Sequence, residues 1–266
     1  MTMPPGAPVL VVEDLVAGYG DEVVLEGVSF TVHAGEIMVI LGPSGCGKST
    51  LLRCIVGLLA PRRGRILIRG HDMVTARGDA RDEILRNVGL SFQEAALLNS
   101  LTVGENVALP IMEHWDVDED TALMLARMRL ARVGLARAGD KMPAELSGGM
   151  RKRAGIARAI ALEPGLLLLD EPSAGLDPIT ARALDELILA LRARGDMGIG
   201  CVTHELGSIE TITDRAIMLD QGRVIAAGTL AEVRGNPDPR VRAFFRRELV
   251  QDVRRASLAD ALELEP

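Results

Sequence analysis

The chain has 266 residues, of which 48% are hydrophobic and 2% aromatic, and its formal net charge is −7. A chain of this size buries a substantial core, and its acidic balance argues against nucleic acid as the main partner, because phosphate backbones bind basic surfaces. Since no apolar run approaches the roughly 20 residues that cross a bilayer, and no signal peptide is visible, we expect a cytosolic protein.

The first elements along the chain are expected to be strands. Residues 8–35 are typical of antiparallel strands that turn at Gly20-Asp21, and the only tyrosine, Tyr19, lies directly before this turn. The run EIMVIL at 36–41 is apolar and rich in β-branched residues, which predicts a short buried strand. Residues 50–56 then have the spacing of a helix.

A glycine-rich segment, GPSGCGKST, joins this strand to this helix and matches the pattern G-x-x-x-x-G-K-[ST]. Glycines allow backbone N–H groups to turn inward around phosphate oxygens, and the start of a helix adds a partial positive charge. Lys48 supplies a full charge to the β and γ phosphates, and Ser49 can ligate Mg²⁺. The segment therefore predicts a nucleotide-binding loop made of Gly42, Pro43, Ser44, Gly45, Cys46, Gly47, Lys48, Ser49 and Thr50.

The segment LSGGM at 146–150 precedes an expected helix. Ser147 is a good N-cap, and the pattern predicts a helix that continues to about Leu162. Gly148 and Gly149 lower helix propensity, which is understandable if backbone amides must approach an anion closely. The basic residues of this helix are expected on a side that faces solvent or a partner: Arg151, Lys152, Arg153 and Arg158.

The next apolar run, LLLL at 166–169, suits a strand that is buried on both faces of a parallel sheet. It is followed directly by Asp170 and Glu171. Two carboxylates at the carboxyl end of a central strand are costly unless they meet a cation or a proton-transfer task. We therefore expect Asp170 to hold Mg²⁺ through water and Glu171 to polarise an attacking water.

Five segments, in this order, resemble the motifs of ATP-binding cassette (ABC) ATPases: GPSGCGKST, LSGG, LLLLDEP, SAGLD at 173–177 and VTH at 202–204. The resemblance implies an α/β fold with a P-loop NTPase (RecA-like) core, an N-terminal antiparallel β subdomain and an α-helical subdomain. One ABC ATPase domain would span 8–235, followed by a helical C-terminal tail. Its parts would be antiparallel strands at 8–35, core segments at 36–93 and about 160–235, and a helical subdomain at about 94–159.

The same resemblance implies ATP and Mg²⁺ as ligands and ATP hydrolysis as the reaction. Two cassettes would enclose two ATP molecules in a homodimer, with the P-loop of one chain facing Ser147, Gly148 and Gly149 of the other. Tyr19 would stack on adenine, and Asp177 would lie at the dimer contact and cap the following helix. The implied catalytic residues are Glu171, His204 and Gln93, and the implied Mg²⁺ ligands are Ser49, Gln93 and Asp170.

A narrower resemblance rests on LSGGM, in which Met150 departs from the commoner glutamine, and on the segments RKRAGIARAIALEP, DEPSAGLDPIT and NPDPRVR. These look like the ATPase of Mla/Mce-type phospholipid transport systems. The resemblance implies an ATPase dimer on the cytoplasmic side of the inner membrane that drives a transmembrane permease. It further implies a small STAS-domain regulator and a periplasmic Mce-type lipid-binding protein as partners.

Three alternatives remain open at this stage. The chain could serve a polar-solute ABC importer, which has the same catalytic residues, or a soluble ABC assembly factor that works without a permease. A DNA-maintenance ATPase is disfavoured by the charge and by the roughly fifty residues between Gln93 and Ser147, where such proteins carry long coiled coils. A neighbouring permease gene would separate the two transporter hypotheses from the assembly factor and the DNA-maintenance ATPase. A neighbouring Mce-domain gene would then separate lipid transport from solute import.

The tail at 236–266 contains an apolar stripe of Phe245, Leu249 and Val253 at helical spacing. Phe244 is expected to point about 100° away from Phe245, so the two rings should not fill one pocket. Three roles remain open for this segment: a helix folded back on its own domain, a clasp on a neighbouring ATPase or regulator, or a contact with anionic lipid.

Overall fold

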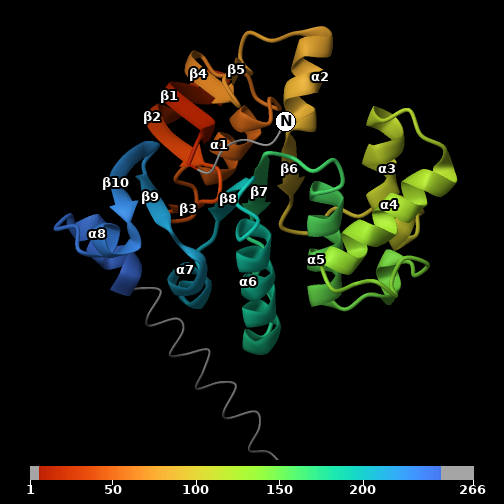
Figure 1. Ribbon diagram of the computed structural model, residues 1–266. Coiled ribbons are helices and arrows are strands. Elements are labelled where there is room, and N and C mark those ends of the chain that lie inside the picture. The colour runs from red at the N-terminus through yellow and green to blue at the C-terminus, as the bar shows by residue number, and fades with distance from the viewer. Residues whose placement is uncertain (1–5, 247–266) are drawn as a thin grey trace, which may run out of the picture.

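The computed structural model describes residues 6–246, and Figure 1 shows their arrangement. The strands of this range are β1 (Pro8–Tyr19), β2 (Glu22–His33), β3 (Ile37–Leu41), β4 (Arg63–Ile68), β5 (His71–Asp72), β6 (Val88–Ser91), β7 (Leu166–Asp170), β8 (Gly198–Val202), β9 (Arg215–Asp220) and β10 (Arg223–Thr229). Its α-helices are α1 (Lys48–Ile55), α2 (Gly78–Arg86), α3 (Val103–His114), α4 (Glu119–Arg132), α5 (Gly148–Ala159), α6 (Pro178–Arg192), α7 (Leu206–Ile212) and α8 (Leu230–Arg234). A single 3₁₀ turn at Pro143–Glu145 precedes α5, and residues 239–246 are also helical.

A six-stranded sheet in the order β10-β9-β3-β8-β7-β6 forms the centre of the fold. Its neighbouring strands pair in parallel except at β9–β10. Every residue of β3 and β8 is buried, as expected for strands with both faces covered. Because β3 and β7 flank β8 in parallel, the loop after Leu41 and the carboxylates at the end of β7 meet at one edge of the sheet.

The second sheet is antiparallel, in the order β2-β1-β4-β5. We expected residues 63–72 to belong to the α/β core, and this was wrong: β4 pairs with β1, with Leu67 opposite Val11. The physical reason is that Ile66 and Ile68 pack in the same buried cluster as the apolar side chains of β1. The antiparallel subdomain therefore contains two segments, 8–33 and 63–72.

Helices α3, α4 and α5 pack together beside the central sheet (Figure 1). α5 also packs against β6, where a Cβ added to Gly89 would lie 2.2 Å from the carbonyl oxygen of Ala159. The expected helix end at about Leu162 was wrong, because α5 is C-capped by Ile160 and Glu163 takes a positive φ of 54°. In residues 6–246, none of the helices has the length and apolar character needed to span a membrane.

The helix at 239–246 folds back on the domain. Val241, Phe244 and Phe245 are all buried in the larger core cluster. The expectation that the two phenylalanines would not share a pocket was wrong: their ring centroids lie 5.4 Å apart in an edge-to-face pair. A helix face wide enough to face a core accommodates two residues that are about 100° apart. Leu249 and Val253 lie outside the described residues, so the stripe itself stays a prediction.

Candidate functional site

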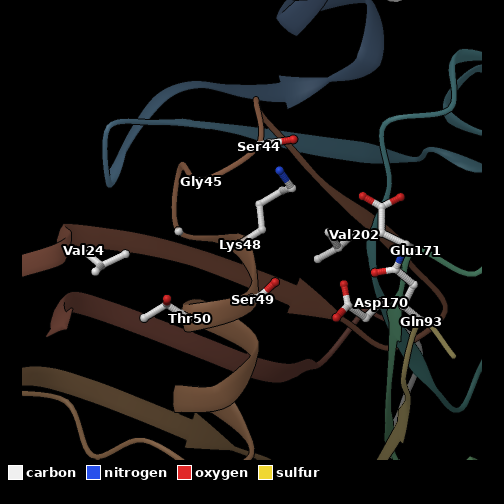
Figure 2. Close-up of a pocket in the computed structure, with 11 residues that line it drawn as sticks. Val24, Ser44, Gly45, Lys48, Ser49, Thr50, Gln93, Asp170, Glu171 and Val202 are labelled. Carbon is white, nitrogen blue, oxygen red and sulfur yellow. The ribbon is translucent and has the colours of Figure 1, made fainter. Parts of the chain in front are cut away.

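A pocket of about 270 Å³ lies at the edge of the central sheet where the motif residues meet. Figure 2 shows its lining, which comes from β2, the loop before α1, α1 itself, the segment after β6, and the ends of β7 and β8. The lining residues are Val24, Ser44, Gly45, Gly47, Lys48, Ser49, Thr50, Gln93, Asp170, Glu171 and Val202.

The backbone of the loop is shaped by close approaches that only glycine permits. Gly42 has a φ of 144°, and a Cβ there would lie 2.3 Å from the carbonyl oxygen of Leu219. Gly47 has a φ of 111° and acts as the N-cap of α1, although no side chain caps this helix. The first N–H groups of a helix have no partner within the helix. The start of α1 is therefore a suitable place for an anion.

Lys48 is held by the loop that it follows. Its Nζ donates hydrogen bonds to the carbonyl oxygens of Gly42, at 2.7 Å, and Pro43, at 2.9 Å. Cys46, also predicted in the nucleotide-binding set, is buried below the loop. A phosphate oxygen is a stronger partner for an ammonium group than a neutral carbonyl, because both groups are then charged. The loop thus presents a full positive charge beside the uncapped helix.

Ser49, Gln93 and Asp170 line the same pocket, and Figure 2 draws Asp170 between the other two. Burial raises the pKa of Asp170, the neighbouring Glu171 raises it further, and the charge of Lys48 lowers it. A bound cation would relieve the cost of keeping this carboxylate ionised. Mg²⁺ commonly takes one or two protein carboxylates together with phosphate oxygens and water. The donor set fits Mg²⁺ bound in that way, because it offers one carboxylate, one amide and one hydroxyl, all with oxygen donors.

Glu171 is fixed in an unusual conformation next to Asp170. Its φ is 48°, a region that is costly for a residue with a Cβ, and its N–H donates to the carbonyl oxygen of Val202 at 2.8 Å. Oε1 contacts Nδ1 of His204 at 2.8 Å. Oε2 is buried and has no hydrogen-bond partner among the described residues. A buried, unpaired carboxylate oxygen at a pocket is well suited to accept a proton or a hydrogen bond from a bound water.

The segment after Leu146 lies away from this pocket. Ser147 is the N-cap of α5, with its hydroxyl accepting from the N–H of Met150 at 3.3 Å, and its side chain is exposed. A Cβ at Gly149 would lie 2.4 Å from Cγ2 of Thr180, so this glycine also allows α5 to approach α6. Neither Ser147, Gly148 nor Gly149 lines the pocket of its own chain. The pocket is thus lined by the loop before α1 but not by Ser147, Gly148 or Gly149 of the same chain.

Tyr19 is 42% exposed and does not line the pocket. Its hydroxyl accepts a hydrogen bond from Arg53 at 2.9 Å, and hydrogen bonds from Thr50 and Arg53 lower its pKa. Sequence reasoning missed Val24 and Val202, which line the pocket from β2 and β8. Val202 begins the VTH segment, of which only His204 was assigned a role, and Val24 is a partly buried strand residue that no local pattern marks.

Of the four basic side chains of α5, Arg151 is exposed, as we expected, whereas Lys152, Arg153 and Arg158 are partly buried and bind main-chain carbonyl groups. Arg153 donates to the carbonyl oxygens of Val133 and Ala183, and Arg158 to those of Ala95 and Ala96. Lys152 donates to the carbonyl oxygens of Gln93 and Glu171, and Arg151 donates to that of Leu146. These carbonyl groups lie in loops, at the C-cap of α4 and, for Ala183, within α6, and the long cationic side chains of α5 supply them with donors.

A buried polar cluster lies beside the end of β7. Asp185 of α6 is 3% exposed, and its Oδ2 accepts a hydrogen bond from the Ser208 hydroxyl at 2.9 Å. Ser208 in turn contacts the Ser173 hydroxyl at 3.2 Å. Oδ1 of Asp185 is buried without a hydrogen-bond partner in the described part of the chain. Burial raises the pKa of Asp185 to about 6, although the hydrogen bond from Ser208 opposes the shift.

We expect the replacement Asp185→Asn to remove a pH dependence of stability. The folded protein binds the Asp185 proton more tightly than the unfolded chain does, so ionisation between the ordinary pKa of 3.8 and about 6 disfavours the folded state. As pH rises through this window, the wild type should lose up to about 3 kcal/mol relative to the variant. The free energy of unfolding in urea, followed across this range, measures the difference. Glu186→Gln, an exposed neighbour on α6, is the control, and a pH-independent difference for Asp185→Asn contradicts the expectation.

Comparison with known proteins places this geometry in a family. The family description "ABC transporter" matches residues 25–174, more than half of the chain. The ATP-binding protein MlaF of the Escherichia coli K12 intermembrane phospholipid transport system is 40% identical over 85% of this chain and 84% of its own length. The probable ribonucleotide transport ATP-binding protein Mkl of Mycobacterium bovis is 39% identical over 88% of this chain. The chain spans only 65% of the length of that relative.

Solved structures agree with these matches. The dimeric ATP-binding cassette MJ0796, in a post-hydrolysis state bound to ADP and Pi, is 30% identical and superposes with a TM-score of 0.75 over 83% of this chain and 98% of its own. The ADP conformation of the cassette MJ1267 is 28% identical, with a TM-score of 0.79 over 90% of this chain and 98% of its own. The P-loop NTPase fold and the pocket at its sheet edge are therefore like those of solved ATP-binding cassettes, and the chain belongs to the ABC transporter family.

Proposed function

We propose that this chain powers phospholipid transport across a bacterial envelope by hydrolysing ATP. The observation that carries the proposal is the 40% identity to MlaF over 85% of this chain and 84% of that relative. A second MlaF, from Haemophilus influenzae, is 38% identical over 89% of this chain and 90% of its length. The likeness thus extends over 84% and 90% of the length of two proteins whose names specify phospholipid transport.

In this proposal the pocket binds the ATP phosphates and activates water. The uncapped start of α1 and Lys48 hold the β and γ phosphates, while Ser49, Gln93 and Asp170 hold Mg²⁺. The bound Mg²⁺ supplies positive charge that neutralises the phosphates. Oε2 of Glu171 would accept a proton from the attacking water. The contact of Oε1 with His204 orients the carboxylate, and His204 would contact the γ-phosphate.

We further propose that the working unit is a homodimer. Ser147, Gly148 and Gly149 do not line their own pocket, and α5 presents the exposed Ser147 at its start, where a helix terminus can meet phosphate. Asp177 caps α6 by accepting from the N–H groups of Ile179 and Thr180. The similarity to a cassette solved as a dimer supports pairing of two copies of this chain. Tyr19, exposed at the rim, would then stack on adenine.

The proposed partners follow from the transport role. The chain would act on the cytoplasmic side of the inner membrane, attached through a transmembrane permease. A small STAS-domain regulator and a periplasmic Mce-type lipid-binding protein would complete the system. The support is the likeness to ATP-binding proteins of the MlaF kind, since substrate specificity lies outside an ATPase subunit.

A second candidate function is transport of a polar solute. The observation in its favour is the 39% identity to the probable ribonucleotide transport protein Mkl. The test is to purify the chain with the permease that the proposal requires and to reconstitute the complex in vesicles. ATPase activity and transfer of fluorescent phosphatidylethanolamine are measured, with ribonucleoside monophosphates as the competing substrate. Lipid transfer that depends on ATP is expected. If ribonucleoside monophosphates stimulate the ATPase activity and no lipid is transferred, the chain belongs to a ribonucleotide transport system instead.

A further inference from the structure

Lys152 occupies a position that the motifs do not assign to any role. It lies on α5, five residues after Ser147, and is half-buried between two segments of the pocket wall. Its Nζ donates to the carbonyl oxygen of Gln93 at 2.5 Å and to that of Glu171 at 3.0 Å. A single ammonium group therefore joins the main chain of two residues whose side chains line the pocket.

The Lys152 ammonium group is partly buried, and the pKa of Lys152 is lowered overall. Burial lowers its pKa, while the negative charges of Glu94, Glu171 and Asp170 raise it. Hydrogen bonds from a charged donor are stronger than neutral ones, and a partly buried site strengthens them further. The two contacts are thus suited to fix the distance between the segment after β6 and the end of β7.

The contact to Glu171 has a particular consequence. Glu171 has a φ of 48°, which persists only when its surroundings determine it. Val202 accepts its N–H and Lys152 donates to its carbonyl oxygen, so the backbone is held on both sides of the Cα atom. Loss of either contact would free the carboxylate from the direction that the pocket requires.

We propose that Lys152 is a positioning residue that ties the helix beginning at Ser147 to both Gln93 and Glu171. A displacement of α5 is then transmitted to the Mg²⁺ ligand and to the general base at the same time. Binding of Ser147 to the nucleotide of a second copy would in this way align the catalytic pair of its own chain. The inference rests on the roles that the proposed function gives to Gln93 and Glu171.

The test compares two lysine variants with a matched control on the same helix. Lys152→Met keeps the aliphatic length and removes the donor, and we expect kcat for ATP hydrolysis to fall about 10- to 100-fold with little change in KM. Lys152→Arg restores donors and should recover most of kcat. Arg153→Met removes a cation that also bridges two carbonyl groups, those of Val133 and Ala183, and should leave kcat unchanged. Thermal unfolding of each protein is measured alongside.

Several results would overturn the inference. These are an unchanged kcat in Lys152→Met, an equal fall in Arg153→Met, or no recovery in Lys152→Arg. If Lys152→Met does not fold, Lys152→Gln takes its place, and a wild-type kcat in that folded variant rejects the role. Glu171→Gln is measured in parallel. Retention of activity there rejects the site assignment itself, whereas loss of activity there combined with a wild-type Lys152→Met rejects only the positioning role.

Discussion

Glu171→Gln is expected to lower kcat for ATP hydrolysis by about 10²- to 10⁴-fold while ATP still binds. The amide is nearly isosteric with the carboxylate, so the contacts of the loop and of Lys48 with phosphate are kept. It cannot accept a proton from water, which is the task assigned to the unpaired Oε2. Single-turnover hydrolysis and equilibrium ATP binding measure the two effects separately. With hydrolysis blocked, the ATP-bound variant should also remain in a closed dimer.

The control for this change is Glu94→Gln, which alters an exposed carboxylate next to Gln93 that does not line the pocket. It should leave basal hydrolysis unchanged. Near-normal ATPase activity of Glu171→Gln would remove the general base from this account. An equal loss in both variants would show that the effect arises from local charge and not from proton transfer.

Lys48→Ala should prevent productive ATP binding and raise the Kd by about 100-fold. The ammonium provides charge-assisted contacts to phosphate that contribute about 1.5–3 kcal/mol each, and no other cationic side chain among residues 6–246 lines the pocket. Titration with a fluorescent ATP analogue measures the affinity. This variant therefore differs from Glu171→Gln, in which binding persists and turnover fails.

Lys141→Ala is the matched control, because Lys141 is exposed on the loop before α5 and does not line the pocket. Its affinity for ATP should equal that of the wild type. If Lys48→Ala binds ATP normally and only turnover is lost, the phosphates are held by the start of α1 alone. The assigned role of the lysine in binding would then be wrong.

The parts of the site that sequence predicts well are those that a short motif fixes completely. The loop before α1 depends on glycines at positions such as Gly42 and Gly47, where a side chain has no space. Asp170 and Glu171 follow a fully apolar strand, so their place at the edge of the sheet follows from the strand itself. Such features depend on neighbouring residues alone, so short sequence motifs were enough to predict most of the residues that line the pocket.

The parts that sequence missed depend on contacts between distant segments. The pairing of β4 with β1 is set by burial of isoleucines in a shared cluster, which a local pattern does not reveal. The carbonyl partners of Lys152 and Arg153 are visible only once other segments pack against α5. From sequence alone, a basic residue on a helix is predicted to face solvent. Only the fold shows that a carbonyl group of another segment lies within its reach.

The central claim is that each nucleotide site is completed by Ser147 of a second copy of the chain. Lys48→Ala and Ser147→Arg should each abolish ATPase activity as pure proteins. In a mixture, every heterodimer carries one complete site, so activity should return to a measurable rate of at most about a quarter of the wild-type value. The rate should fall below a quarter to the extent that Lys152 couples Ser147 to the catalytic pair, because the chain with the intact P-loop carries Ser147→Arg. If the mixture stays as inactive as the two variants alone, or if Ser147→Arg is active by itself, the site is not shared between two chains.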